Sequence, residues 1–87
     1  MSSERPVYTV TQVNSYLKAV MDQDRLLSGL FVRGEISNFK TYPSGHSYFS
    51  LKDEGGSLRC VMFRREASRL RFRPENGMKV IAFGRIT

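Results

Sequence analysis

The sequence has few of the residue types on which enzymes and metal sites depend. Its 87 residues include one cysteine, one histidine and no tryptophan. A single cysteine excludes an internal disulfide, and with a single histidine it leaves too few ligands for a zinc site. Neither a Walker-type loop nor a Gly-x-Gly-x-x-Gly loop is present. We therefore expect no metal, no cofactor and no catalytic residue in this chain.

Long hydrophobic runs are also missing. No apolar stretch approaches the ~20 residues that cross a bilayer, and the opening MSSERPVYT has no hydrophobic signal core. The length allows one domain, and 40% hydrophobic with 25% charged residues is typical of a globular one. A lone cysteine suits a reducing compartment. We expect a cytoplasmic protein without a membrane partner.

Acidic residues become scarce in the last third of the chain. The net charge is +6, and basic and acidic residues cancel in both 1–29 and 30–58. Residues 59–87 contain eight basic residues and only two acidic ones, Glu66 and Glu75. Such asymmetry favours a polyanionic partner, nucleic acid before an anionic membrane. A basic face that only meets water is the alternative.

An N-terminal helix is predicted at about residues 10–23. Thr9 and Gln12 have the spacing of a capping box. Apolar residues then recur at helical spacing from Val10 to Met21. We expect this apolar stripe to pack against the core, and we assign residues 1–29 to an N-terminal extension.

Residues 30–87 are expected to form a mainly β domain. Alternating apolar and polar residues, separated by turn formers, predict four strands and one short helical connection. The strands are placed at 30–40, 46–52, 57–63 and 78–87, and the helical connection at 64–72. Gly34 offers the bend or bulge that a small barrel needs.

Alternate side chains of a strand point to opposite faces, so each strand can serve both a core and a partner. Phe49 and Leu51 are expected to face inward. In the next strand the inward set is Leu58, Cys60 and Met62, and the outward set is Arg59, Val61 and Phe63. A pairing shifted by one residue would exchange these two sets. Cys60, between apolar residues, is expected to be an inert thiol.

Aromatic and cationic residues are interleaved on the outward faces. Proteins that hold single-stranded nucleic acids stack bases on aromatic side chains and follow the phosphates with basic ones. The candidate nucleic-acid-binding residues are Phe63, Arg64, Tyr48, Arg59, Arg65, Phe39, Lys40, His46 and Lys52. The alternative to a binding role is a core position for Phe63 and Phe39 and a turn position for His46. Arg69, Arg71 and Arg73 are expected to face water.

Several segments together carry a family resemblance. They are YTVTQVNSYLK, GEISNFK, SGHSYFSLKDE, LRCVMFR and LRFRPENGMKV, covering the chain from about Tyr8 to Thr87. They resemble the N-terminal domain of the large-subunit family of exodeoxyribonuclease VII. The resemblance implies an OB-fold, a five-stranded Greek-key barrel, that presents single-stranded DNA to a nuclease. That nuclease degrades single strands from both ends into short oligonucleotides without a strict need for divalent metal.

The resemblance also implies what lies elsewhere in such proteins. The catalytic residues belong to a central domain and the small subunits engage a C-terminal helical region, so this chain is expected to bind DNA without cutting it. The sequence ends at Gly84–Thr87, whereas in this family a fifth strand follows the fourth. We therefore expect an incomplete OB-fold, truncated after the fourth strand, whose open edges favour self-association or strand exchange.

Two other functions stay open at this point. The first is a structural or protein-interaction barrel, in which the arginines would meet an acidic protein surface. The second is a self-contained nuclease, which the missing acid, base and metal ligands disfavour. The sequence does not decide between DNA and RNA, because it reports on no contact with a 2′-hydroxyl.

Overall fold

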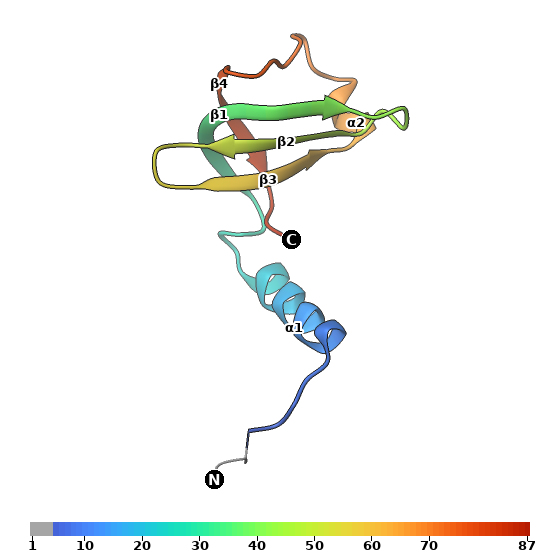
Figure 1. The fold of residues 1–87 in the computed structure, drawn as a ribbon, viewed down its shortest axis with the longest axis vertical. Coiled ribbons are helices and arrows are strands. Elements are labelled where there is room, and N and C mark those ends of the chain that lie inside the picture. Colours follow the sequence, from blue (N-terminus) through green and yellow to red (C-terminus); the bar gives the residue numbers. More distant parts are fainter. Residues whose placement is uncertain (1–4) are drawn as a thin grey trace. The chain divides into compact units, whose positions relative to one another are not determined.

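A computed structural model describes residues 5–87, with one helix preceding a set of strands (Figure 1). The elements are α1 (Val10–Gln23), β1 (Leu30–Thr41), β2 (Ser47–Lys52), β3 (Ser57–Met62), α2 (Arg64–Ala67) and β4 (Lys79–Gly84). The predicted order of elements is confirmed. The described chain divides into two compact units, residues 5–31 with 83–87, and Val32–Ala82. Residues 1–4 of the predicted extension lie outside the described residues.

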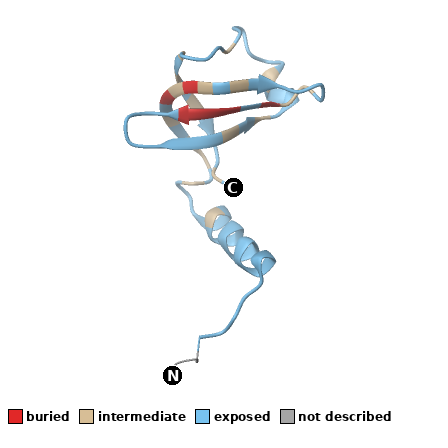
Figure 2. Ribbon diagram, in the orientation of Figure 1, coloured by how far each residue is buried: buried red, intermediate tan, exposed pale blue. Residues whose placement is uncertain are grey.

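α1, in the first unit, begins at the predicted capping box. The Thr9 Oγ1 accepts from the Gln12 N–H at 3.0 Å, and the Gln12 Oε1 accepts from the Thr9 N–H at 2.8 Å. The predicted helix at 10–23 is confirmed. No residue of α1 is buried (Figure 2). Because α1 and the core belong to different compact units, the expectation that its apolar stripe packs against the core stays a prediction. Helical periodicity tells which residues share a face but does not supply a partner for that face.

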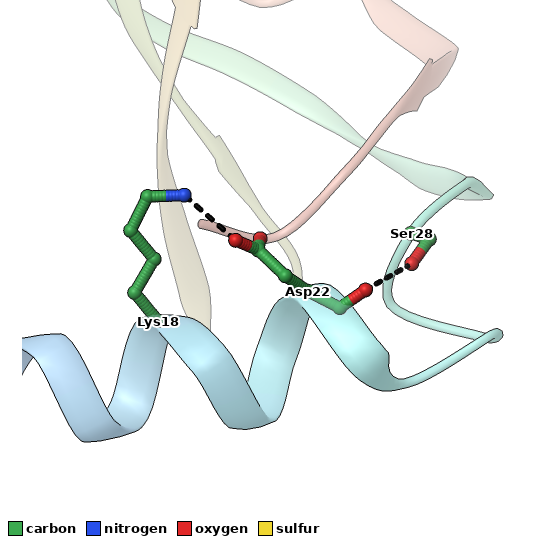
Figure 3. Close-up of polar contacts among 3 residues, drawn as sticks. All are labelled: Lys18, Asp22 and Ser28. Carbon is green, nitrogen blue, oxygen red and sulfur yellow. Dashed lines mark hydrogen bonds and ion pairs between the residues drawn. The ribbon is translucent and has the colours of Figure 1, made fainter.

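Polar contacts fix the last turn of α1 and the segment after it. The Lys18 Nζ lies 2.7 Å from the Asp22 Oδ2, and the Ser28 hydroxyl donates to the Asp22 carbonyl at 3.3 Å (Figure 3). The same hydroxyl also contacts the Asp24 carbonyl, at 2.6 Å. The Lys18–Asp22 pair is the single ion pair among residues 5–87. Because both side chains are exposed, it contributes at most ~1 kcal/mol.

The four strands form one sheet in the order β3-β2-β1-β4. β2 is antiparallel to both neighbours, with Leu51 opposite Ile36 in β1 and Phe49 opposite Cys60 in β3. Two backbone hydrogen bonds of 2.8 Å join Ile36 to the segment before β4: its N–H donates to the Met78 carbonyl, and its carbonyl accepts from the Gly77 N–H. β1 and β2 are therefore the central strands, and β3 and β4 are the edges.

The core of the second unit is small and lies on one face of β1 and β2. Ile36, Phe49 and Leu51 are its buried residues (Figure 2). Partly buried side chains pack around them: Val32, Phe39, Cys60, Met62, Met78, Val80 and Ala82. Of the residues predicted to face inward on β2 and β3, Phe49, Leu51, Cys60 and Met62 lie at this core. Leu58, predicted to face inward with them, is 42% exposed and does not join the core.

The bulge of β1 lies nearer its end than expected. The register against β2 shifts between Ser37 and Lys40, and Asn38 between them has φ 54°. Gly34, where the bend or bulge was expected, is buried and lies before the register shift. A Cβ there would lie 3.2 Å from both the Leu51 Cδ2 and the Lys52 carbonyl oxygen. Gly34 therefore serves close approach of two strands rather than a change of register.

The connection from β3 to β4 is less helical than predicted. α2 is a single turn, Arg64–Ala67, and the expectation of helix as far as residue 72 is wrong. Leu70 and Phe72 are 37% and 53% exposed. Around them Arg69, Arg71 and Arg73 recur at every second position, a period that matches no helix face. β4 is also shorter than predicted and ends at Gly84.

Candidate nucleic-acid interface

The interface candidates lie mainly on the sheet face opposite the core. The pairing aligns side chains in rows across β1, β2 and β3, since directly paired residues share a face. One row contains Lys40, Tyr48 and Val61. The next row contains Ser37, Ser50 and Arg59. The Tyr48 ring is therefore flanked by two cations, Lys40 in its own row and Arg59 in the next row.

Tyr48 is paired with a second tyrosine from the loop before β2. The rings of Tyr42 and Tyr48 are edge to face, with centroids 5.2 Å apart and planes at 74°. The Lys40 Nζ lies 5.4 Å from the Tyr42 centroid, within the range of a cation–π contact. Both rings are about two-fifths exposed, Tyr42 at 43% and Tyr48 at 38%. Two aromatic surfaces next to an ammonium group can hold a planar ring and an anion together.

A shallow hollow opens beside these rings. Its volume is about 360 Å³, and its lining residues are Tyr42, Ser44, Tyr48 and Arg59. The Arg59 guanidinium is held there by a hydrogen bond of 3.2 Å from its Nη1 to the Ser50 hydroxyl. Ser50 is buried beneath it, so Arg59 is both oriented by the sheet and exposed at its outer end.

A second group lies where β3 gives way to α2. Phe63 is 56% exposed, and its ring meets the edge of His46 at 5.4 Å and 89°. The Arg64 N–H donates to the His46 Nδ1 at 2.9 Å. Phe63 is two residues beyond the partner of Tyr48. Such diagonal neighbours on a sheet face are about 7–8 Å apart, so both groups belong to one continuous surface.

The remaining predicted site residues lie at the margins or on the other face. Lys52 is exposed at the hairpin end of β2, opposite Glu35 in β1, and Arg65 is exposed on α2. Phe39 packs on the core, with its ring 5.8 Å from that of Phe49. The structure therefore separates Phe39 from the outward aromatic residues.

Tyr42 is the residue that the sequence analysis did not single out. It lies in the loop between β1 and β2, where turn formers dominate and strand alternation no longer tells which way a side chain points. The sequence does carry one signal for Tyr42, which is its spacing of two residues from Lys40. This pair continues the alternation of cationic and aromatic residues into the turn.

Nothing in the described part of the chain suggests catalysis. Among residues 5–87 no three His, Cys, Asp or Glu side chains gather closely enough to hold a metal ion. Burial raises the pKa of the Cys60 thiol above its usual value, outweighing a backbone hydrogen bond from Leu51 and the nearby Arg59 charge. A raised pKa leaves little thiolate near neutral pH. Within the same residues, no helix has the length and apolarity to span a membrane.

Comparison with known families decides what kind of domain this is. Residues 8–87 match the family described as OB-fold nucleic acid binding domain. The chain belongs to this family. The OB-fold predicted from the sequence is thus confirmed, and the antiparallel sheet and the N-terminal helix agree with it.

Comparison with individual proteins also confirms the resemblance to the large subunit of exodeoxyribonuclease VII. The OB-fold chain is 57% identical over 81 residues to the exodeoxyribonuclease 7 large subunit of Clostridium acetobutylicum, covering 93% of this chain and 20% of that protein. Identity with the same subunit of Natranaerobius thermophilus is 58% over 82 residues, covering 94% and 19% respectively. For Clostridium tetani it is 54% over 81 residues, covering 93% and 20%. The chain spans about a fifth of the length of these curated relatives.

Proposed function

We propose that this OB-fold binds single-stranded DNA on the outward face of β1, β2 and β3. The observation that carries the proposal is the hollow beside Tyr42 and Tyr48, with Lys40 and Arg59 at its sides. Single strands expose both faces of their bases, and stacking on an aromatic ring contributes ~1–3 kcal/mol per base. Duplex DNA hides those faces, so the same surface discriminates against it.

The path of the strand follows from the order of these groups. Bases stack on Tyr48 and Phe63, with Tyr42 as a further platform, while Arg59 and Arg64 contact the phosphates. Lys40, Lys52 and Arg65 add positive charge at the margins. His46 lies beneath Phe63, and Phe39 is left out because its ring belongs to the core. Sequence preference is weak, since stacking and phosphate contacts do not read base edges.

We further propose that the chain acts within the large subunit of an exodeoxyribonuclease VII. Its similarity to such subunits over more than nine-tenths of its length supports this. In that setting residues 30–87 are the DNA-binding module and residues 1–29 an N-terminal extension. The module presents single strands to a catalytic domain outside these residues, for exonucleolytic degradation in the cytoplasm. The small subunit is a partner of regions other than this chain.

The open edges of the sheet add one further element to this proposal. β3 and β4 each have a neighbour on one side only among the described strands. An unpaired strand edge attracts another strand, so we propose that copies of the chain associate through these edges. Light scattering tests this point: a mass that rises with concentration is expected, and a constant monomer mass contradicts it.

Fluorescence anisotropy of a labelled thymidine oligonucleotide tests DNA binding. Tyr48→Ala removes a stacking platform and should weaken binding by ~1–3 kcal/mol. Tyr16→Ala is the matched control, because Tyr16 is an exposed tyrosine of α1, outside the proposed face. Its affinity should equal that of the unmodified chain.

The outcomes separate the candidate functions. Salt-sensitive binding that unlabelled duplex does not displace, and that Tyr48→Ala weakens, supports the proposal. Binding that both tyrosine variants retain would place the contact elsewhere. Absence of binding at low salt would favour a protein-interaction barrel instead.

A further inference from the structure

His46 is tied to the start of α2 by two contacts, and Gly45 before it packs against the same segment. Its Nδ1 accepts from the Arg64 N–H at 2.9 Å, and its ring meets the Phe63 ring edge to face at 5.4 Å. The preceding Gly45 has φ 91°, and a Cβ at that position would overlap the Arg64 side chain. Gly45 and His46 therefore pack closely against Phe63 and Arg64.

The hydrogen bond has a definite role in the backbone. The first N–H groups of a helical turn have no partner within the helix. Phe63 is the N-cap of α2 and has no side chain that could accept from them. The imidazole of His46, eighteen positions earlier, supplies the acceptor instead. The backbone at Phe63 and Arg64 is thus fixed by a residue of the neighbouring strand end.

We propose that His46 is a positioning residue for DNA binding, holding Phe63 and Arg64 in their binding geometry through an unprotonated Nδ1. The inference rests on the proposed function and changes the role expected for His46, from a direct DNA contact to a support. An acceptor Nδ1 carries no proton, so the neutral ring holds its proton on Nε2.

The backbone of His46 is anchored separately from its ring. Its carbonyl accepts from the Tyr42 N–H at 3.0 Å, and its N–H donates to the Ser44 hydroxyl at 3.3 Å. The contacts of the ring with Phe63 and Arg64 are therefore additional links, directed to the start of α2.

Replacing the ring by an amide tests the inference. In His46→Asn the amide oxygen can accept from the Arg64 N–H, so the affinity for a thymidine oligonucleotide should stay close to that of the unmodified chain.

Two further variants measure the coupling. Phe63→Ala and His46→Ala should each weaken binding by about 5- to 150-fold, the loss of one stacked base. The double variant should be little weaker than either single one, since both remove the same platform.

Each other outcome overturns the inference. A loss of affinity in His46→Asn as large as in His46→Ala would show that His46 does not act through its Nδ1 acceptor. Additive losses in the double variant would separate His46 from Phe63. If no oligonucleotide binds at pH 8, the proposed function itself fails.

Discussion

A single tyrosine illustrates how the binding face depends on its immediate neighbours. Tyr48 is exposed on one side of β2, whereas Phe49, the next residue, is buried on the other. The Tyr48 ring is held by Tyr42 and lies opposite Lys40. Its orientation is thus fixed before a ligand arrives, which lowers the entropic cost of binding.

Gly34 provides a test of packing between β1 and β2. Gly34→Ala should destabilise the fold by ~1–3 kcal/mol, because the added methyl would press on the Leu51 side chain and the Lys52 carbonyl. Gly55→Ala is the control, since a Cβ at Gly55 meets nothing within 4 Å. Urea denaturation of both variants measures the difference. Equal midpoints would contradict the close approach seen at Gly34.

Residue by residue, the sequence predicted a side chain's face wherever strand alternation continued without interruption. Phe49 and Leu51 inward, and Arg59 and Phe63 outward, follow directly from a period of two. The face of Phe39 could not be predicted in this way, because the bulge at Asn38 shifts the alternation just before Phe39. A bulge depends on pairing between strands and leaves little trace in one strand's own sequence.

Among the elements, β1 is the one whose geometry determines the rest. Its bulge turns the strand end that carries Lys40, and the Asn76 side chain caps the irregular segment by accepting from the Phe39 N–H at 2.8 Å. That contact joins residues 37 positions apart. It holds the β1 end and the turn before β4 in one arrangement.

Asn38 makes the bulge testable. A positive φ is strained for β-branched residues and open to glycine. Asn38→Val should cost ~1–3 kcal/mol of stability, whereas Asn38→Gly should be close to neutral. Thermal unfolding of the two variants checks this. A valine variant as stable as the glycine one would show that the strand pairs without a left-handed residue.

Element boundaries were predictable where a chemical signal marks them. The capping box of Thr9 and Gln12 located the start of α1, and turn formers marked the hairpin between the strands predicted at 46–52 and 57–63. The length of α2 was overestimated because arginines and apolar residues alternate after Ala67, and composition alone was read as helix.

At the scale of the described chain, charge contributes little to folding. Residues 5–87 contain one ion pair, on the exposed surface of α1. The arginines from Arg64 to Arg73 therefore have no carboxylate partner in the described chain. A basic surface without internal partners attracts phosphates and releases their counterions on binding.

The salt dependence of binding measures how many of these arginines contact DNA. Replacing Arg69, Arg71 and Arg73 by glutamine should flatten the slope of log affinity against log salt by about 2, if each neutralises one phosphate. The same exchange at Arg5, Arg25 and Arg85 removes equal charge from the first unit and is the control. An unchanged slope in the first variant would mean that Arg69, Arg71 and Arg73 only face water.

β2 serves two unrelated purposes in six residues. Phe49 and Leu51 are needed for the core, Tyr48 and Ser50 for the surface that meets the ligand and orients Arg59. A substitution at one position therefore affects folding, and a substitution at the next position affects the proposed DNA binding. Almost no substitution within such a strand is neutral during evolution. Adaptation to a different ligand is therefore easier at the ends of the strand, in the loop that contains Tyr42 and at Lys52.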